Sequence, residues 1–444
     1  MLFQSLWLDE AIEAVSVREN SFLTLVTVYP LGDFHPPLFH LVLKVWTLMF
    51  GFSEISVRFP SVLLGLGTVF VVYKIGETLA NKKVAILAAL FFALAPLHVY
   101  YSGEARMYSM AAFFATASVY FFIKLLNNEK WSWFLFFVST VALLYTDYVP
   151  YFLIPVFWIY VFLQRENLPK NFMKMWFVTN FLIFVMLLPW LPVFYRQLEV
   201  GQKAQTLLPL WSEVVGGFSI KSLFVTGAKF ISGRISSYNK FLYGSFIFLS
   251  GTLFLLLLTK SIFSNMKRKI LIYLWLFSPI ILGWLASIFI PIFSYFRFLF
   301  SLPPLYLVLG AATSEMRKGF LISATSLILI INFSSVMIFY TNPRFQKENW
   351  REASSFLDKN SKNGEIVTIL SFSGEFAPFE YYRENFSYGG PELISENLRE
   401  IFFVPYLSPI FDPRGKTEKL LVDSGFRRVS GKDFGEIIVW KYQR

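Results

Sequence analysis

The sequence contains no cysteine, so it can form no disulfide bond, thiolate metal site or cysteine nucleophile. Charge is also scarce, because only 16% of the 444 residues are charged, whereas 55% are hydrophobic and 20% aromatic. With a mean hydropathy of +0.54, this composition excludes a soluble enzyme, a disordered tail and a nucleic-acid-binding module. It indicates a polytopic membrane protein whose side chains face lipid and headgroups.

Motifs for nucleotide and metal chemistry are absent as well. The sequence has no Walker loop, no Gly-x-Gly-x-x-Gly, no Asp-x-Asp pair that holds a metal for a nucleotide-sugar, and no His/Cys metal-ligand spacing. Nucleotide chemistry therefore has no evident place in this chain, and the spacing predicts no metal site.

Ten segments are apolar enough to be candidate membrane-spanning helices, and two of them are marginal in length. They cover residues 58–79, 83–101, 105–126, 131–147, 148–164, 172–195, 241–259, 269–290, 295–312 and 318–340. The fold class that this pattern predicts is mainly α, with a polytopic transmembrane domain at residues 58–341.

The net charge of +11 marks membrane topology rather than a nucleic-acid partner. Basic residues gather in every second loop, at Lys82–Lys83, Lys124 with Lys130, Arg165 with Lys170 and Lys174, Lys260 with Lys267–Lys269, and Arg317–Lys318. The positive-inside rule makes these loops cytoplasmic and the alternate loops extracytoplasmic. We therefore expect a multi-pass protein of the plasma membrane with its C-terminal hundred residues outside.

The N-terminal region, residues 1–57, is predicted to be the first external loop. An even number of spans puts residue 1 outside without a visible signal peptide, so we expect a further spanning helix before it or an unusual translocation. Residues 36–51 are too short to span comfortably and carry Lys44 and Trp46, which favours an interfacial helix on the outer surface.

Residues 342–444 differ abruptly in composition and predict a small extracytoplasmic α/β domain. Amphipathic helices are expected at 346–360 and 417–424, and strands at 365–371, 402–406 and 436–441.

Polar residues that flank the apolar segments gather on the predicted outer face, and they are Asp9, Glu10, Glu13, Asp33, His35, Arg58, Glu104, Arg106, Asp147 and Arg297. For several of these residues a purely structural role is the alternative to a function. Asp9 and Glu10 suit the first turn of a helix, Asp33 suits a helix N-cap beside an interfacial His35, and Glu104 with Arg106 can pair within an aromatic belt. Arg297 can snorkel to the headgroups, and for Arg58 we favour that interpretation.

An acidic and basic cluster at one membrane face, without a nucleotide site, suits a lipid-phosphate substrate delivered from the outer leaflet. Two other functions stay open. A lipid-linked sugar flippase or transporter would place polar residues near mid-membrane and show related halves. A noncatalytic scaffold would use its external α/β domain to bind a partner.

Four motifs in order resemble those of the GT-C membrane glycosyltransferases, and in particular the protein mannosyltransferase-like family that includes the lipid A aminoarabinose transferase. They are Ser5–Ala11, Asp33–Leu38, Phe50–Glu54 with Val57–Ser61, and Tyr101–Tyr108. The segment from Arg297 to Pro304 and the stretch Asn349–Ala353 are also similar to the family. Its first external loop normally follows a spanning helix, which this sequence lacks before residue 1.

The resemblance implies transfer of a sugar from a polyprenyl phosphate to an acceptor hydroxyl on a glycan, lipid or protein. It implies an acidic pair at the catalytic position, which here is Asp9 and Glu10. We expect Asp9 to be the general base, because the acceptor hydroxyl loses its proton as it attacks the anomeric carbon. A single displacement would invert that carbon.

The remaining site residues are expected to bind substrate. Arg106 and Arg297 are candidates for the departing lipid phosphate, which guanidinium groups bind bidentately. Asp33, His35 and Glu104 would position sugar or acceptor, or bind a divalent ion if one is used. Tyr108 closes the fourth motif and is expected to contact substrate as well.

Overall fold

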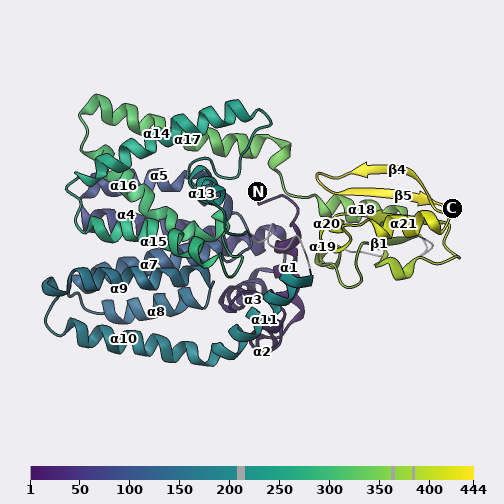
Figure 1. Ribbon diagram of the computed structural model, residues 1–444, viewed down its shortest axis with the longest axis horizontal. Coiled ribbons are helices and arrows are strands. Elements are labelled where there is room, and N and C mark those ends of the chain that lie inside the picture. The colour runs from purple at the N-terminus through teal and green to yellow at the C-terminus, as the bar shows by residue number, and fades with distance from the viewer. Residues whose placement is uncertain (1, 208–215, 362–365, 383–385) are drawn as a thin grey trace.

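The computed structural model describes residues 2–207, 216–361, 366–382 and 386–444. A large bundle of helices occupies most of the molecule, and a smaller α/β domain lies beyond one end of it (Figure 1). The predicted fold class, a polytopic helical protein with a small α/β domain at its C-terminus, is confirmed.

Short helices form the N-terminal region at the bundle end nearest the α/β domain (Figure 1). They are α1 (Leu8–Glu19), α2 (Phe22–Thr27), η1 (Tyr29–Leu31) and α3 (Leu38–Phe50). The predicted interfacial helix at 36–51 corresponds to α3, which packs on α1 and α4.

The bundle follows in an order close to that of the predicted segments. Its elements are α4 (Glu54–Leu79), α5 (Lys82–Ala93), α6 (Pro96–Ser102), α7 (Tyr108–Leu126), α8 (Ser132–Leu144), η2 (Val149–Phe152), α9 (Leu153–Leu163), η3 (Arg165–Asn167), α10 (Phe172–Leu187), η4 (Leu188–Trp190), α11 (Leu191–Leu207), α13 (Ile220–Ser232), α14 (Lys240–Ile262), α15 (Lys269–Ala286), η5 (Tyr295–Ser301), α16 (Leu302–Ser314) and α17 (Lys318–Thr341).

Seven helical stretches among the described residues are long and apolar enough to cross a membrane, and there are eight if the pair α5 and α6 is one bent span. That pair bends by 63° just before Pro96, whose ring cannot continue a helix. The helices at the predicted spans 131–147 and 148–164 are shorter than predicted, since α8 has 13 residues and α9 only 11. Pro150 lies between them, in a separate 3-10 turn that begins at Val149.

Small residues let the central helices approach closely. A Cβ atom on Gly76 of α4 would lie 2.8 Å from the Cα of Ala85 on α5, and one on Gly310 of α16 would lie 2.9 Å from the nitrogen of Ala88. Helices in membranes associate largely through such close packing, since lipid is as apolar as their side chains. Every residue of α16 is buried, so this helix lies at the centre of the bundle.

The α/β domain contains one five-stranded sheet in the order β2-β1-β3-β5-β4. β1 pairs in parallel with β2 and β3, whereas β5 is antiparallel to β3 and β4. The elements are η6 (Pro343–Phe345), α18 (Trp350–Asn360), β1 (Val367–Leu370), α19 (Ala377–Tyr382), β2 (Ser387–Gly389), η8 (Pro391–Leu393), β3 (Glu400–Val404), α20 (Ser408–Phe411), α21 (Lys416–Asp423), β4 (Arg427–Asp433) and β5 (Ile438–Gln443).

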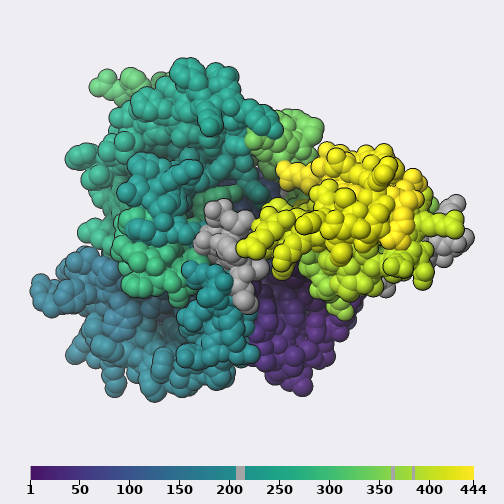
Figure 2. All heavy atoms as spheres, turned by 45° about the vertical axis from the view of Figure 1, so that its right-hand side comes forward, coloured from purple at the N-terminus to yellow at the C-terminus, as the bar shows by residue number. Residues whose placement is uncertain are grey.

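This domain rests on the N-terminal region through polar contacts. The backbone N–H of Leu6 donates to the Tyr382 hydroxyl at 2.7 Å, and the Arg351 guanidinium donates to the Phe3 carbonyl at 2.9 Å. Arg351 also pairs with Glu54 at the start of α4. The α/β domain, yellow-green to yellow, consequently lies over the purple N-terminal segment (Figure 2).

We predict that Trp350→Ala destabilises the α/β domain. Trp350 is completely buried, and its ring centroid lies 4.9 Å from those of Phe376 and Tyr406. Truncation of such a side chain costs about 3–5 kcal/mol of unfolding free energy. Urea-dependent proteolysis of the C-terminal segment measures the change, and Val429→Ala on the exposed edge strand β4 is the control. Equal urea midpoints for the two variants would contradict the prediction.

Candidate active site

The predicted site residues come from four separate segments that meet where the bundle faces the α/β domain. α1 carries Asp9 and Glu10 in its first turn, where carboxylates interact favourably with the helix dipole. The other residues lie in the loop before α3, in the loop between α6 and α7, and in η5.

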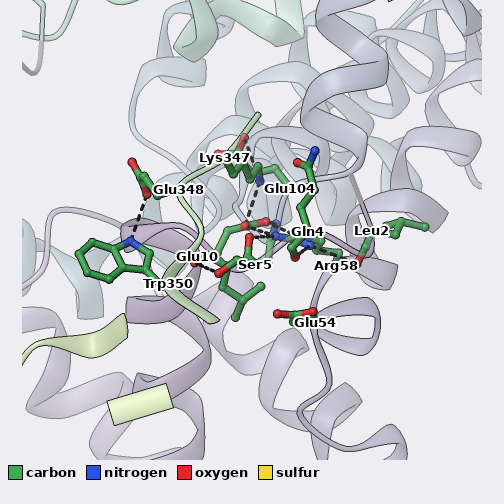
Figure 3. A network of polar contacts seen from close by, with 12 residues as sticks. Leu2, Gln4, Ser5, Glu10, Glu54, Arg58, Glu104, Lys347, Glu348 and Trp350 are labelled. Atoms are coloured by element: carbon green, nitrogen blue, oxygen red, sulfur yellow. Dashed lines mark hydrogen bonds and ion pairs between the residues drawn. The ribbon is translucent and has the colours of Figure 1, made fainter. Parts of the chain in front are cut away.

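A buried ion pair joins α1 to α4. The Nε and Nη2 atoms of Arg58 donate to the two carboxylate oxygens of Glu10 at 2.8 and 2.6 Å, and both side chains are completely buried. Arg58 also donates hydrogen bonds to the backbone carbonyls of Leu2, Gln4 and Ser5 (Figure 3). The expectation that Arg58 snorkels to the headgroups is therefore wrong, because its guanidinium holds the N-terminal segment inside the protein.

Glu10 is fully engaged by other groups. It also accepts the backbone N–H of Ala105 at 2.9 Å, and the ammonium of Lys347 lies 2.9 Å from its Oε2. Burial opposes its charge, but Lys347 and Arg58 together lower the pKa of Glu10 to about 2. A carboxylate held in this way has no free oxygen for a substrate, so direct catalysis by Glu10 does not fit the geometry. We assign it a positioning role.

Lys347 is a site residue that the sequence did not reveal. The pattern placed it within a helix at 346–360, but α18 begins at Trp350, with Asn349 as its N-cap. Lys347 therefore lies in the linker before this helix, and its side chain is only 4% exposed. No hydropathy signal distinguishes it from the neighbouring surface lysines, which explains why it was missed.

Glu104 lies beside this ion cluster but is less fully paired. Its Oε2 atom is 3.9 Å from the Lys347 ammonium, and its carboxylate accepts no hydrogen bond from the described residues. Burial of a side chain that is 1% exposed raises the pKa of Glu104. The carboxylate thus keeps acceptor positions for hydroxyl groups.

Arg106 links the two faces of α1. Its Nη1 atom donates to Glu13 at 2.7 Å, and its Nη2 atom lies 4.0 Å from the Oδ2 of Asp9. These two acids hold the charged form of Arg106, whose pKa is raised although burial opposes it. The side chain of Asp9 is 36% exposed, whereas those of Glu10 and Glu13 are buried. Of these three acids, Asp9 is therefore the one that a substrate can reach.

A chain of acids and imidazoles continues from Glu13. Nδ1 of His40 lies 2.6 Å from the Oε2 of Glu13, and its Nε2 lies 3.2 Å from the Oδ2 of Asp33. The other Asp33 oxygen contacts His35 at 3.4 Å. Despite burial, the charges of Glu13 and Asp33 raise the pKa of His40 to about 10. Asp33 is thus paired with both imidazoles rather than acting as an N-cap, and sequence reasoning missed His40.

The remaining predicted site residues are Tyr108, at the start of α7, and Arg297, in η5. Tyr108 packs edge-on against Tyr101 and Phe296, with ring centroids 5.0 and 5.3 Å apart. Arg297, which follows Phe296, is half-buried, and its guanidinium makes no ion pair or hydrogen bond with any described residue. This cation is available to an anion.

A second unpredicted cation lies nearby. Arg234, just after α13, donates to the Tyr100 hydroxyl, and its guanidinium lies 4.7 Å from the centre of that ring. The side chain is exposed in part and faces the same group of tyrosines as Glu104. The sequence did not distinguish Arg234, because the predicted external loop at residues 196–240 contains several other basic residues.

A divalent ion does not fit the side chains described here. Within the described ranges, no three His, Asp or Glu side chains are grouped so that they could hold a metal ion. Glu10, Glu13 and Asp33 are already bound to cationic partners.

We predict that His40→Gln destabilises the protein in a pH-dependent way. The protonated imidazole stabilises the buried carboxylate of Glu13 and the partly buried one of Asp33, so its loss costs about 3–5 kcal/mol at low pH. Because the folded-state pKa of His40 is raised to about 10, this stabilisation is full below its ordinary pKa of ~6.5. It declines as pH rises and is lost above about 10.

Melting temperatures of the detergent-solubilised protein across this pH range test the prediction. His35→Gln is the control, because His35 makes one longer contact and should cost less. A difference between wild type and His40→Gln that does not change with pH would contradict it.

Part of the chain is similar to a known protein family. Residues 34–192 match the sequence profile of the dolichyl-phosphate-mannose-protein mannosyltransferase family. No curated protein sequence matches the chain.

Solved structures extend the similarity to almost the whole chain. ArnT from Cupriavidus metallidurans, in the apo state and bound to undecaprenyl phosphate, matches with TM-scores of 0.62 and 0.60 at 12% identity, over 99% of this chain and 94% of that one. The oligosaccharyltransferase AglB from Archaeoglobus fulgidus, in complex with an inhibitory peptide and a dolichol-phosphate, matches with a TM-score of 0.53 at 12% identity, over 91% of this chain and 66% of that one. The profile match over residues 34–192 and the fold shared with ArnT over almost the whole chain both agree with the resemblance seen in the sequence.

Proposed function

We propose that this protein is a glycosyltransferase that moves a sugar from a polyprenyl-phosphate-linked donor to an acceptor hydroxyl on the outer face of the plasma membrane. The observation that carries the proposal is the open carboxylate of Asp9 beside the buried guanidinium of Arg106. The structural relatives bound to undecaprenyl phosphate and to a dolichol-phosphate support a lipid-phosphate donor.

Asp9 is the general base of the proposed reaction. The acceptor hydroxyl gives its proton to the Asp9 carboxylate while its oxygen forms a bond to the anomeric carbon of the sugar. The bond between that carbon and the phosphate oxygen breaks in the same step, and the electron pair leaves with the lipid phosphate. A single displacement of this kind inverts the anomeric carbon.

The arginines stabilise the departing phosphate. Arg297 is the principal candidate, because it has no anionic partner among the described residues. Arg234, on the tyrosine side of the site, supplies a second guanidinium. Arg106 is held by Glu13 and is better suited to orient Asp9 than to bind the lipid phosphate. Charge-assisted bonds of this type gain strength as the leaving group develops charge.

Other polar groups orient the substrates. The unfilled acceptor positions of Glu104 suit hydroxyl groups of the sugar. His35 and Asp33 lie at the less buried end of the imidazole chain, where they suit the acceptor. Tyr108 is proposed to contact the substrates as well.

The location of the basic loops supports the proposed orientation. Lys83 donates to the Ser314 carbonyl, the Lys267 N–H donates to that of Leu79, and Arg268 bonds to Asn127, so these loops meet at one end of the bundle. Arg58 and Leu79 are separated along α4 by about 30 Å, which is the thickness of a membrane core. This separation supports the proposal that the candidate site and the positive loops lie at opposite membrane faces.

We predict that Asp9→Asn reduces transfer by about 10²–10⁴-fold, because an amide cannot take the acceptor proton. Membranes that contain the protein would be assayed with lipid-linked sugars, with glycolipids and glycoproteins followed by mass spectrometry. Glu19→Gln, which removes an exposed carboxylate from the same helix, should leave transfer unchanged. Full turnover by Asp9→Asn would refute the assignment, and a loss of lipid translocation alone would favour a flippase.

We also predict that Arg297→Met weakens use of the lipid donor. Loss of one charged hydrogen bond costs about 1.5–3 kcal/mol, which corresponds to about 10–150-fold in kcat/KM. Product inhibition by free polyprenyl phosphate should weaken in parallel. Arg196→Met, at an exposed pair with Glu199, is the matched control. Unchanged inhibition in Arg297→Met would show that phosphate binds elsewhere.

A further inference from the structure

A buried lysine reaches the candidate site from the linker to the α/β domain. Lys347 lies between η6 and α18, in the segment that connects the helical bundle to the α/β domain. Its side chain is nevertheless almost inaccessible to solvent. It points away from the α/β domain and toward Glu104 and Glu10 (Figure 3). Buried lysines are rare unless they are paired, so this placement calls for a specific partner.

The surroundings of the ammonium group explain its burial. It lies 2.9 Å from Glu10 and 3.9 Å from Glu104, and it also faces the rings of Trp7 and Tyr100 at 6.0 and 5.7 Å. Two acids and two aromatic faces thus stabilise one cation.

The charges in this cluster balance only if Lys347 is included. Arg58 makes a bidentate pair with Glu10 and neutralises that carboxylate alone. Glu104 faces the acids Glu10 and Asp9 and the cations Lys347 and Arg234. Lys347 is the only one of these cations within 4 Å of Glu104 among the described residues. Without it, a buried carboxylate would be left without a close counter-charge.

We propose that Lys347 is a positioning residue of the site: the linker to the α/β domain supplies the cation that keeps Glu104 ionised and in place. The membrane part of the site is therefore complete only when this linker is docked. The role of Glu104 in binding sugar rests on the proposed function, whereas its charge balance does not.

Neighbouring contacts tie the position of Lys347 to the docking of the domain. The next residue, Glu348, accepts the Tyr406 hydroxyl at 2.6 Å and the Leu8 backbone N–H at 3.4 Å. It therefore joins the α/β domain to the start of α1, at the residue directly before Asp9 and Glu10. A shift of the domain on α1 would move the ammonium group directly.

Labelling with dicyclohexylcarbodiimide, which reacts with protonated carboxyl groups in apolar surroundings, tests the proposal on the full-length protein in detergent. Lys347→Met should increase the labelling of Glu104, quantified by peptide mass spectrometry, by about five-fold or more, because Glu104 loses its counter-charge. Arg351→Gln is the matched control. It removes a nearby cation that pairs with Glu54 at the domain interface rather than with Glu104. It should leave Glu104 labelling at the wild-type level.

A merely structural role would give another result. If Lys347→Met and Arg351→Gln lower the melting temperature but neither changes Glu104 labelling, the proposal is overturned. If Lys347→Met does not fold, Lys347→Gln carries the same test. The double variant Lys347→Met with Glu104→Gln should melt higher than Lys347→Met alone, because opposite charges are removed together. A lower melting temperature for the double variant would also overturn it.

Activity measurements separate this inference from the proposed function. Lys347→Met should lower kcat/KM by about ten-fold or more in the wild-type background, but by less than about two-fold when Glu104 is already Gln. If the wild-type protein transfers no sugar while the labelling changes as expected, the proposed function fails and the charge balance stands. If transfer occurs but labelling does not change, the inference about Lys347 fails alone.

Discussion

The bidentate ion pair between Glu10 and Arg58 is the contact on which the geometry of the site depends. A buried pair is stable only if its other polar atoms are also satisfied, since both charges have left water. Here Arg58 binds the carbonyls of the N-terminal segment, and Glu10 accepts the N–H of Ala105. Ala105 lies between Glu104 and Arg106. One carboxylate therefore fixes α1, α4 and the loop that presents both of these residues.

The same helix gives its acids different environments. Adjacent residues on a helix point about 100° apart, so when Glu10 faces α4, Asp9 turns toward the open side. Glu13, one turn later, contacts Arg106 and His40 and holds them in register with Asp9. A closed carboxylate thus supplies rigidity, and its open neighbour keeps the exposure that the proposed proton transfer requires. These requirements conflict for one residue, which explains why the chain uses a pair.

The sequence predicted what depends on local pattern. Each of the ten predicted apolar runs overlaps a helix of the bundle, although Pro150 and Pro96 divide some of them in ways that hydropathy does not record, and α13 was not predicted. In the α/β domain, the exposed polar edge strand β4 was missed because it lacks alternation. The predicted motif residues lie near one another in the candidate site, whereas Lys347 and His40 were not predicted. Their role follows from contacts between segments far apart in the chain, and a single lysine in a polar linker looks like any surface lysine.

The linker to the α/β domain shows how far such distant contacts reach. α17 ends at Thr341 and α18 starts at Trp350, so Lys347 lies in the short connection between the two parts. Glu348 and Trp350 are tied to the domain and to α1. Burying an ammonium group in this position is costly unless its acids are already in place. The domain interface and the charge balance of the membrane site must therefore form together, and neither part of the molecule specifies the site alone.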